Sequence, residues 1–166
     1  MTKQIYLAGG CFWGTQAYFE RLKGVTDALC GYANGKTANP TYEQVCRDNT
    51  GHAETVLVEY DPDLISLEKL LTEFFKNIDP TTKNRQGNDI GSQYRSGIYF
   101  VDEADAPVIQ GFIASKQQDF TSPIVTEVLP LSNFYPAEAY HQHYLDKNPN
   151  GYCHVDLGLI RPEDRK

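Results

Sequence analysis

Residues 3–14 read Lys-Gln-Ile-Tyr-Leu-Ala-Gly-Gly-Cys-Phe-Trp-Gly, and this stretch decides how the fold begins. The apolar run from Lys3 to Ala8 predicts a buried strand. Phe12 to Leu22 predicts a helix, because its large apolar side chains recur near one face. The glycine pair between them has no Cβ, so the backbone can turn sharply there. The chain therefore passes from a strand into a helix at Cys11.

Strands and helices alternate along the rest of the chain. Further strands are predicted at Val25 to Ala33, Glu54 to Tyr60, Gly97 to Val101 and Ile124 to Leu129, and further helices at Tyr42 to Arg47, after Ser66, and at Glu103 to Phe120. The clearest helix follows Ser66, a good N-cap residue, and its apolar side chains lie at helical spacing: Leu67, Leu70, Leu71, Phe74, Phe75 and Ile78. This order predicts an α+β fold, a two-layer sandwich of helices packed on a sheet.

The length of 166 residues fits one domain spanning 1–166. Two segments lack periodicity: Asp79 to Ser96, and an irregular C-terminal tail from Ser132 to Lys166 that carries Cys153. Long irregular segments in a compact domain are often functional or mobile. We therefore expect site residues in both segments.

Composition excludes several classes of function. The net charge of −7 argues against a nucleic-acid partner or an anionic membrane surface. No run of 18 apolar residues predicts a membrane helix, and the stretch before Cys11 is too short for a secretion signal. The four cysteines show neither a C-x-x-C motif nor zinc-like spacing. We expect a cytoplasmic, thiol-dependent enzyme.

A metal site is not expected. His141 and His143 alternate, and His154 follows them, but no carboxylate or third ligand has useful spacing. Cys30 and Cys46 fall within predicted secondary structure, so we expect them to be packing residues.

Cys11 is the candidate nucleophile. A thiol at a helix N-terminus faces unpaired backbone N–H groups and the positive end of the helix dipole, which favour the thiolate. Phe12 and Trp13 follow it directly, and a reactive sulfur beside aromatic rings suits a substrate with a soft, apolar group. Taken alone, however, a cysteine after two glycines is more often a small buried hydrophobe.

Glu54 is the candidate acid. It stands at the entry to an apolar strand, where burial would keep a carboxyl protonated near neutral pH. The alternative is an ordinary exposed glutamate at the start of a strand. Tyr42 and Tyr94 offer hydroxyl donors, and Asp89 lies in the same polar region as Tyr94.

These residues fall within motifs that occur in order along the chain. The motifs are Gly10-Cys11-Phe12-Trp13-Gly14, Pro40-Thr41-Tyr42 with Val45-Cys46, Gly51-His52-Ala53-Glu54, Tyr60-Asp61-Pro62, Gln86-Gly87-Asn88-Asp89, Gly91 with Gln93-Tyr94-Arg95-Ser96, Phe134-Tyr135-Pro136-Ala137-Glu138 with Tyr140-His141-Gln142, and Gly151-Tyr152-Cys153. With them the chain resembles the A-type peptide methionine sulfoxide reductases, enzymes that repair methionine sulfoxide.

The resemblance implies a role for each candidate residue. Cys11 matches the nucleophile, which becomes a sulfenic acid, and Cys153 matches the resolving cysteine, which forms a disulfide with it. Glu54 matches the acid, with Tyr42 and Tyr94 as its hydrogen-bonding partners. Phe12 and Trp13 match the residues that form an apolar wall for the S-methyl group. Asp89 matches a substrate-binding residue.

The resemblance also implies a ferredoxin-like core with a mixed sheet, and a preference for the S epimer of the sulfoxide, in proteins or as the free amino acid. Thioredoxin or a small dithiol is the expected reductant, with no bound cofactor, and we expect a monomer. Some relatives carry one more cysteine downstream to relay the disulfide, whereas no cysteine follows Cys153 here.

Two other functions use related chemistry. A thiol peroxidase also passes through a sulfenic acid and a resolving cysteine, although the aromatic residues beside Cys11 favour a larger apolar substrate. A redox sensor or peptide-binding module would form no methionine from the sulfoxide.

Overall fold

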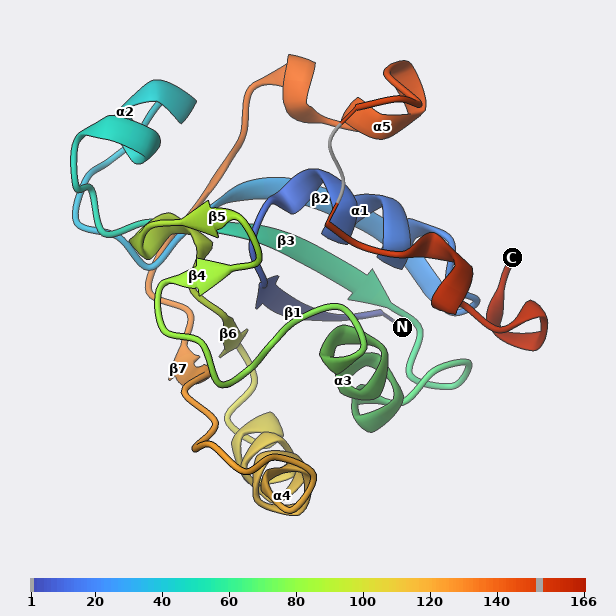
Figure 1. Cartoon of the computed structure of the whole chain (residues 1–166). Coiled ribbons are helices and arrows are strands. Elements are labelled where there is room, and N and C mark those ends of the chain that lie inside the picture. The colour runs from blue at the N-terminus through green and yellow to red at the C-terminus, as the bar shows by residue number, and fades with distance from the viewer. Residues whose placement is uncertain (1, 152–153) are drawn as a thin grey trace.

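A computed structural model describes residues 2–151 and 154–166. Within these ranges six strands form one mixed sheet, ordered β7-β6-β1-β3-β2-β8 (Figure 1). Its strands are β1 (Lys3–Ala8), β2 (Val25–Ala33), β3 (Ala53–Tyr60), β6 (Gly97–Phe100), β7 (Glu127–Pro130) and β8 (Phe134–Pro136). All neighbours are antiparallel except the parallel pair β6 and β7. A separate hairpin joins β4 (Arg85–Gln86) to β5 (Asp89–Ile90).

The α-helices in the described residues are α1 (Phe12–Glu20), α2 (Tyr42–Arg47), α3 (Leu67–Phe75), α4 (Asp105–Gln117) and α5 (Tyr144–Lys147). The predicted α+β class is confirmed, and β1, β2 and α2 have the predicted bounds. Ser66 caps α3 as expected, since its hydroxyl accepts a hydrogen bond from the backbone N–H of Lys69. None of these helices combines the length and apolar character needed to span a bilayer.

The core lies between the sheet and the helices α1 and α3. Alternate residues of the central strands turn their side chains to this face, among them Ile5 and Leu7 of β1. The stripe predicted for α3 packs against them, and Leu70, Leu71 and Phe74 are almost completely buried. This packing fixes the point at which β1 passes into α1.

Other predicted elements have different bounds. β3 begins at Ala53 instead of Glu54, β6 ends at Phe100 instead of Val101, and the helix after Ser66 ends at Phe75, before Ile78. The helix expected from Phe12 to Leu22 stops at Glu20, and Leu22 instead pairs with Arg165 of the tail. The helix expected from Glu103 to Phe120 is the shorter α4. The strand expected from residue 124 begins at Glu127, because Ile124 and Val125 donate their N–H groups to the Gln117 side chain and the Pro80 carbonyl.

The tail contains short elements that residue periodicity does not reveal. β8 adds to the edge of β2, and α5 lies over α1 (Figure 1). The last residues return to the end of α1, where the Lys166 N–H donates to the Arg21 carbonyl. The tail therefore contacts both ends of the helix that Cys11 begins.

Gly9 lies where β1 meets α3 at close range. A Cβ built at Gly9 would stand 2.7 Å from both the Ile78 and Phe74 side chains, and Phe74 is held in the core. At Gly111, in the middle of α4, a Cβ would meet nothing within 4 Å.

We predict opposite effects of adding a methyl group at these two positions. Gly9→Ala should lower the free energy of unfolding by about 1–3 kcal/mol, because it overpacks the core. Gly111→Ala should raise it by about 0.5–1 kcal/mol, because alanine favours the helix. Urea unfolding of both variants measures the change in the free energy of unfolding. Equal changes in the two variants would show that the side chains around Gly9 leave room for a methyl group.

Candidate active site

Cys11 is the N-cap residue of α1. It follows the sharp turn at Gly10, whose φ of +84° belongs to the region that favours glycine. The residue is 8% exposed and therefore buried. Its side chain does not cap the helix, so the first amides of α1 are left for other partners.

Glu54 supplies one of those partners. Its Oε1 accepts a hydrogen bond of 3.2 Å from the backbone N–H of Phe12, the residue after Cys11. Its Oε2 is buried and has no hydrogen-bond partner among the described residues. The side chain is 1% exposed, so the alternative of an exposed strand-start glutamate is excluded.

Burial controls the ionisation of Glu54. It raises the pKa of the carboxyl to about 8, against the smaller lowering effect of the Phe12 N–H bond, and the nearby Asp89 charge raises it further. The group is therefore protonated at neutral pH, and the oxygen without a partner can carry the proton.

The register of β3 explains why a carboxyl is buried here. Glu54 lies on the same side of the strand as Val56, Val58 and Tyr60, all of which belong to the main core. The alternation of residues along β3 predicts that the three apolar side chains lie on one side of the strand. Continued back by two residues, the same alternation places Glu54 on that side. This period-two pattern is the sequence signal for its burial.

Tyr42 and Tyr94 come from separate segments and meet at the Cys46 thiol, near enough to Glu54 for its charge to act on both. Tyr42 is the first residue of α2, and Tyr94 ends a single 3₁₀ turn, Ser92–Tyr94. Burial, and then the Glu54 charge, raise the pKa of both phenols, so they remain protonated donors. Cys11 and Asp89 also contribute to the field at the Tyr94 hydroxyl.

Asp89 lies on the β4–β5 hairpin, near Glu54 and Tyr94. It is partly exposed, and its charge acts on Glu54 and Tyr94. The irregular segment from Asp79 to Ser96 therefore contributes two of the predicted site residues, as its composition suggested.

Aromatic rings form one wall beside Cys11. Phe12 is 1% exposed and lies in the core, whereas Trp13 is partly exposed. The Trp13 ring stacks on Tyr144 of α5 with centroids 3.8 Å apart, and its Nε1–H donates to His141 Nδ1 at 3.0 Å. The His141 ring also lies 4.4 Å from the ring of Tyr42, so the tail completes the wall.

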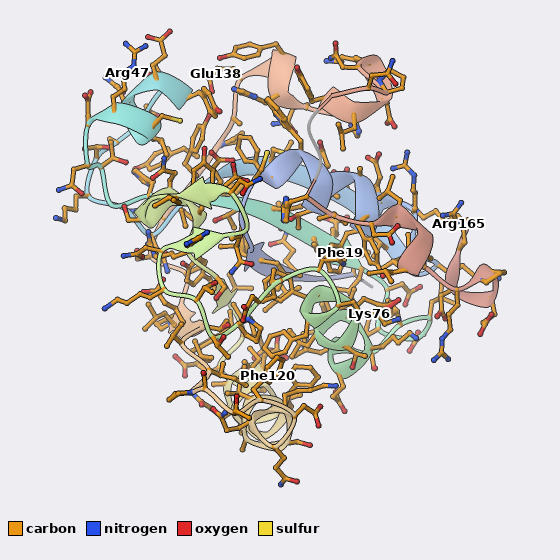
Figure 2. The ribbon with its side chains drawn as sticks, in the orientation of Figure 1. Phe19, Arg47, Lys76, Phe120, Glu138 and Arg165 are labelled. Atoms are coloured by element: carbon orange, nitrogen blue, oxygen red, sulfur yellow. The ribbon has the colours of Figure 1, made fainter. Side chains whose placement is uncertain are left out.

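Sequence reasoning assigned no role to several residues that assemble this site. Glu138, labelled in Figure 2 beside α2, accepts hydrogen bonds from the Tyr42 backbone N–H and the Tyr32 hydroxyl and so fixes the start of α2. Gln16 of α1 donates to Gln142 of the tail, which bonds the backbone of β2. Glu138 and Gln142 belong to the motif at residues 134–142. Their place in this motif is the sequence signal that could have identified them.

The other cysteines occupy different environments. Cys30 is fully buried, and its thiol contacts the Gln16 side chain, which agrees with a packing role. Cys46 is only half-buried: burial raises the pKa of its thiol, while hydrogen bonds from Tyr42 and Tyr94 oppose this. Cys46 was expected only to pack against its neighbours, but its thiol also hydrogen-bonds with two of the predicted site residues, Tyr42 and Tyr94. Cys153 lies outside the described residues.

The three histidines considered for a metal site do not converge. His141 faces Trp13, and His154 binds the Gly9 carbonyl. His143 lies beside Glu20 and Asp146, whose carboxylates also pair with Arg21.

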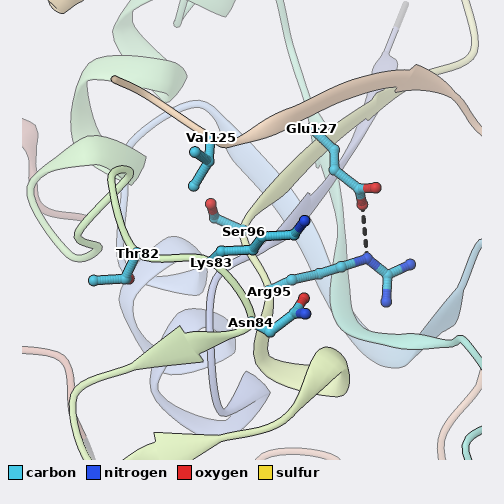
Figure 3. Close-up of a pocket in the computed structure, with 7 residues that line it drawn as sticks. All are labelled: Thr82, Lys83, Asn84, Arg95, Ser96, Val125 and Glu127. Carbon is cyan, nitrogen blue, oxygen red and sulfur yellow. Dashed lines mark hydrogen bonds and ion pairs between the residues drawn. The ribbon is translucent and has the colours of Figure 1, made fainter. Parts of the chain in front are cut away.

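A cavity of about 220 Å³ has none of the predicted site residues in its lining (Figure 3). It is lined by Thr82, Lys83, Asn84, Arg95, Ser96, Val125 and Glu127. Two of the lining residues, Arg95 and Glu127, form an ion pair at 2.7 Å. Arg95 is therefore engaged in holding β7 against the segment that carries Tyr94.

We predict a pH-dependent cost of burying Glu54. Between its ordinary pKa of 4.5 and its folded pKa of about 8, the unfolded chain releases a proton that the folded chain keeps. The free energy of unfolding therefore falls as pH rises, by up to about 1.4 kcal/mol per pH unit. Glu54→Gln removes this contribution, so urea unfolding should show the variant gaining on wild type from pH 5 to 8. A difference that does not change with pH would contradict the burial.

Comparison with known proteins assigns the chain to a family. Residues 3–165 match the model of the peptide methionine sulfoxide reductase family. The chain is 57% identical to peptide methionine sulfoxide reductase MsrA of Clostridium acetobutylicum over 159 residues, which cover 96% of this chain and 98% of that protein.

Solved structures agree. The structure of Mxr1 from Saccharomyces cerevisiae in reduced form matches with a TM-score of 0.87 and 41% identity, covering 94% of this chain and 92% of that one. Mxr1 in complex with Trx2 matches with a TM-score of 0.60 and 30% identity, covering 86% and 84%. The gathering of Cys11 and Glu54 at one helix N-terminus, together with these matches, leads to one conclusion: the chain belongs to the peptide methionine sulfoxide reductase family and is an oxidoreductase.

Proposed function

We propose that the protein reduces the S epimer of methionine sulfoxide, in oxidised proteins and as the free amino acid, by nucleophilic attack of Cys11 assisted by Glu54. One observation carries the proposal. Glu54 is buried, and one of its oxygens is fixed by the first amide of α1 while the other has no partner among the described residues. This burial raises the pKa of the carboxyl to about 8, which favours the protonated acid. A general acid next to a nucleophile at a helix N-terminus suits a substrate whose oxygen must be protonated.

Glu54 acts on the sulfoxide oxygen. The S–O bond is polar, and protonation makes the sulfur electrophilic. The hydroxyls of Tyr42 and Tyr94 stay protonated, and on substrate binding they turn from the Cys46 thiol and donate hydrogen bonds to the sulfoxide oxygen. The positive end of α1 favours the Cys11 thiolate, and a neutral Glu54 places no second negative charge beside it.

The reaction at Cys11 balances as an oxygen transfer. The thiolate attacks the sulfur of the protonated sulfoxide and forms a transient sulfur–sulfur bond. The hydroxyl oxygen then passes from the methionine sulfur to Cys11: the sulfur–sulfur bond and the methionine S–O bond break, a Cys11 S–O bond forms, and the thioether of methionine leaves. Methionine sulfur gains two electrons, and Cys11 sulfur loses two and becomes a sulfenic acid. Trp13 and Phe12 form the apolar wall that receives the S-methyl group, and Asp89 binds the polar part of the substrate.

Recycling proceeds through a disulfide. The sulfenic acid condenses with the Cys153 thiol, which forms the Cys11–Cys153 bond and releases water. Thioredoxin, or a small dithiol, then reduces the bond by exchange, with no bound cofactor. The complex of the related Mxr1 with Trx2, a thioredoxin, supports this partner. The enzyme thus repairs proteins after oxidative damage.

We also infer that residues 1–166 form one domain, a two-layer sandwich with a ferredoxin-like core and a largely irregular tail. The common core shared by α1, α3 and the sheet supports this arrangement. A monomer in the cytoplasm is the remaining part of the proposal, and the acidic net charge of −7 is compatible with it.

Single-turnover kinetics test the two principal roles. Cys11→Ser should form no methionine from the sulfoxide, because a serine oxygen cannot lose two electrons and take up the sulfoxide oxygen as the cysteine sulfur does. Glu54→Gln keeps the shape and hydrogen bonding but cannot donate a proton, so its single-turnover rate should fall by about 10²–10⁴-fold with little change in substrate affinity.

Ser122→Ala, on an exposed loop, serves as the control and should match wild type. Residual turnover by Cys11→Ser, or an unchanged rate in Glu54→Gln, would contradict the assignment. Peroxide consumption without sulfoxide reduction would indicate a thiol peroxidase instead.

A further inference from the structure

The carboxylate of Glu138 in the tail joins two tyrosines from different elements. Its Oε1 accepts a hydrogen bond of 2.8 Å from the hydroxyl of Tyr32 on β2, and its Oε2 accepts one of 2.9 Å from the backbone N–H of Tyr42 on α2. The exposed Tyr140 hydroxyl makes a longer bond of 3.4 Å to Oε2. Glu138 therefore bridges β2 and the start of α2 with its two oxygens.

The Tyr32 end of this bridge is fixed by the core. Tyr32 is 0% exposed, and its ring centroid lies 5.7 Å from that of Phe12. In the register of β2 with β3, Tyr32 lies directly opposite Glu54, and paired residues of antiparallel strands turn their side chains to the same face. The Tyr32 hydroxyl is thus held by the same two strands that hold the candidate acid.

The α2 end of the bridge depends on contacts from outside the helix. Within this helix of six residues Val45 alone is buried, so few side chains hold it to the core. Thr41 and Gln44 form a capping box, in which each side chain accepts a hydrogen bond from the backbone N–H of the other. Those two bonds stay within the start of the helix. The Tyr42 N–H instead binds Glu138, which ties the backbone of Tyr42 to the sheet through Tyr32.

Glu138 is ionised, in contrast to Glu54. Partial burial acts to raise the pKa of the Glu138 carboxyl, but hydrogen bonds from the backbone N–H of Tyr42, from its own N–H and from the Tyr32 hydroxyl outweigh this effect, so the pKa is lowered. An ionised carboxylate accepts hydrogen bonds with both oxygens and donates none. The two carboxyl groups thus have different tasks: Glu54 keeps a proton, and Glu138 holds donors in place.

We propose that Glu138 is a positioning residue for the reduction: by fixing the backbone of Tyr42 relative to Glu54, it sets the pivot from which the Tyr42 hydroxyl reaches the sulfoxide oxygen. This inference rests on the proposed function, which makes Tyr42 a donor to that oxygen. Displacing a catalytic group by about 1 Å can lower a rate about a hundredfold. A fixed pivot therefore raises the rate without any contact between Glu138 and the substrate.

Single-turnover kinetics test the proposal, with reduced enzyme in excess over methionine sulfoxide and chromatography of the methionine formed. The saturating rate of Glu138→Ala should fall about tenfold, with little change in the enzyme concentration at half-saturation. Glu138→Gln can accept from the Tyr42 N–H and donate to the Tyr32 oxygen, so it should keep most of the wild-type rate. Tyr32→Phe removes one bond of the bridge and should slow the reaction about threefold.

Double variants show whether Glu138 acts through Tyr42. In Tyr42→Phe the hydroxyl is already absent, so adding Glu138→Ala should lower the rate by less than about twofold further. In Tyr94→Phe, which keeps the Tyr42 hydroxyl, the same addition should still lower it about tenfold. A general loss of folding would lower the rate equally in both backgrounds. Asp164→Ala, which removes another carboxylate of the tail and its ion pair with Lys69, should match wild type.

Three results would overturn the proposal. The first is a wild-type rate in both Glu138→Ala and Tyr32→Phe. The second is equal slowing by Glu138→Ala in the Tyr42→Phe and Tyr94→Phe backgrounds. The third is a Glu138→Gln variant as slow as Glu138→Ala, because the charge and not the pair of hydrogen bonds would then matter.

Tyr42→Phe alone separates the two levels of the inference. If it forms methionine at the wild-type rate, Tyr42 is not a donor, and both that part of the proposed function and the Glu138 proposal fail. If Tyr42→Phe is slow while Glu138→Ala and Tyr32→Phe are not, only the Glu138 proposal fails.

Discussion

The site depends on the burial of one carboxyl group at the start of one helix. A charged Glu54 would be costly at 1% exposure, because a single N–H bond from Phe12 does not replace its hydration. The carboxyl is therefore neutral in the folded protein at pH 7, with its pKa raised to about 8. The same burial destabilises the fold above the ordinary pKa of glutamate, so the chain gives up some stability to keep an acid beside Cys11.

Four separate segments converge on this carboxyl and hold it in place. β3 provides Glu54, the β1–α1 turn provides Cys11, α2 provides Tyr42, and the segment after β5 provides Tyr94. The tail then fixes these parts to one another: Glu138 binds the first amide of α2, and α5 covers Trp13. The tail is thus part of the site as well as the carrier of Cys153.

The sequence predicts elements best where local pattern and tertiary packing agree. β1 was predictable from its apolar run, and the cap and apolar face of α3 were predictable from Ser66 and the helical spacing after it. The predicted bounds of β2 and α2 also hold. β8 was not, because three residues carry no alternation and their pairing with β2 depends on a distant strand. At the site, residue chemistry marked Cys11 and Glu54 as candidates. The bond between Glu54 and the N–H of Phe12, the residue after Cys11, spans 42 positions, and this bond and the Trp13–His141–Tyr144 contacts arise only from the fold.

The protonation state of Glu54 can be observed directly. Infrared spectra of the reduced enzyme, with glutamate carboxyl carbons labelled with ¹³C, would be compared with those of Glu54→Gln prepared in the same way. A protonated carboxyl band should be present at pH 6.5 in wild type, absent from the variant, and should disappear with a midpoint near the pKa of about 8. If wild type shows no such band at pH 6.5, Glu54 is ionised, and a buried acid beside Cys11 is contradicted.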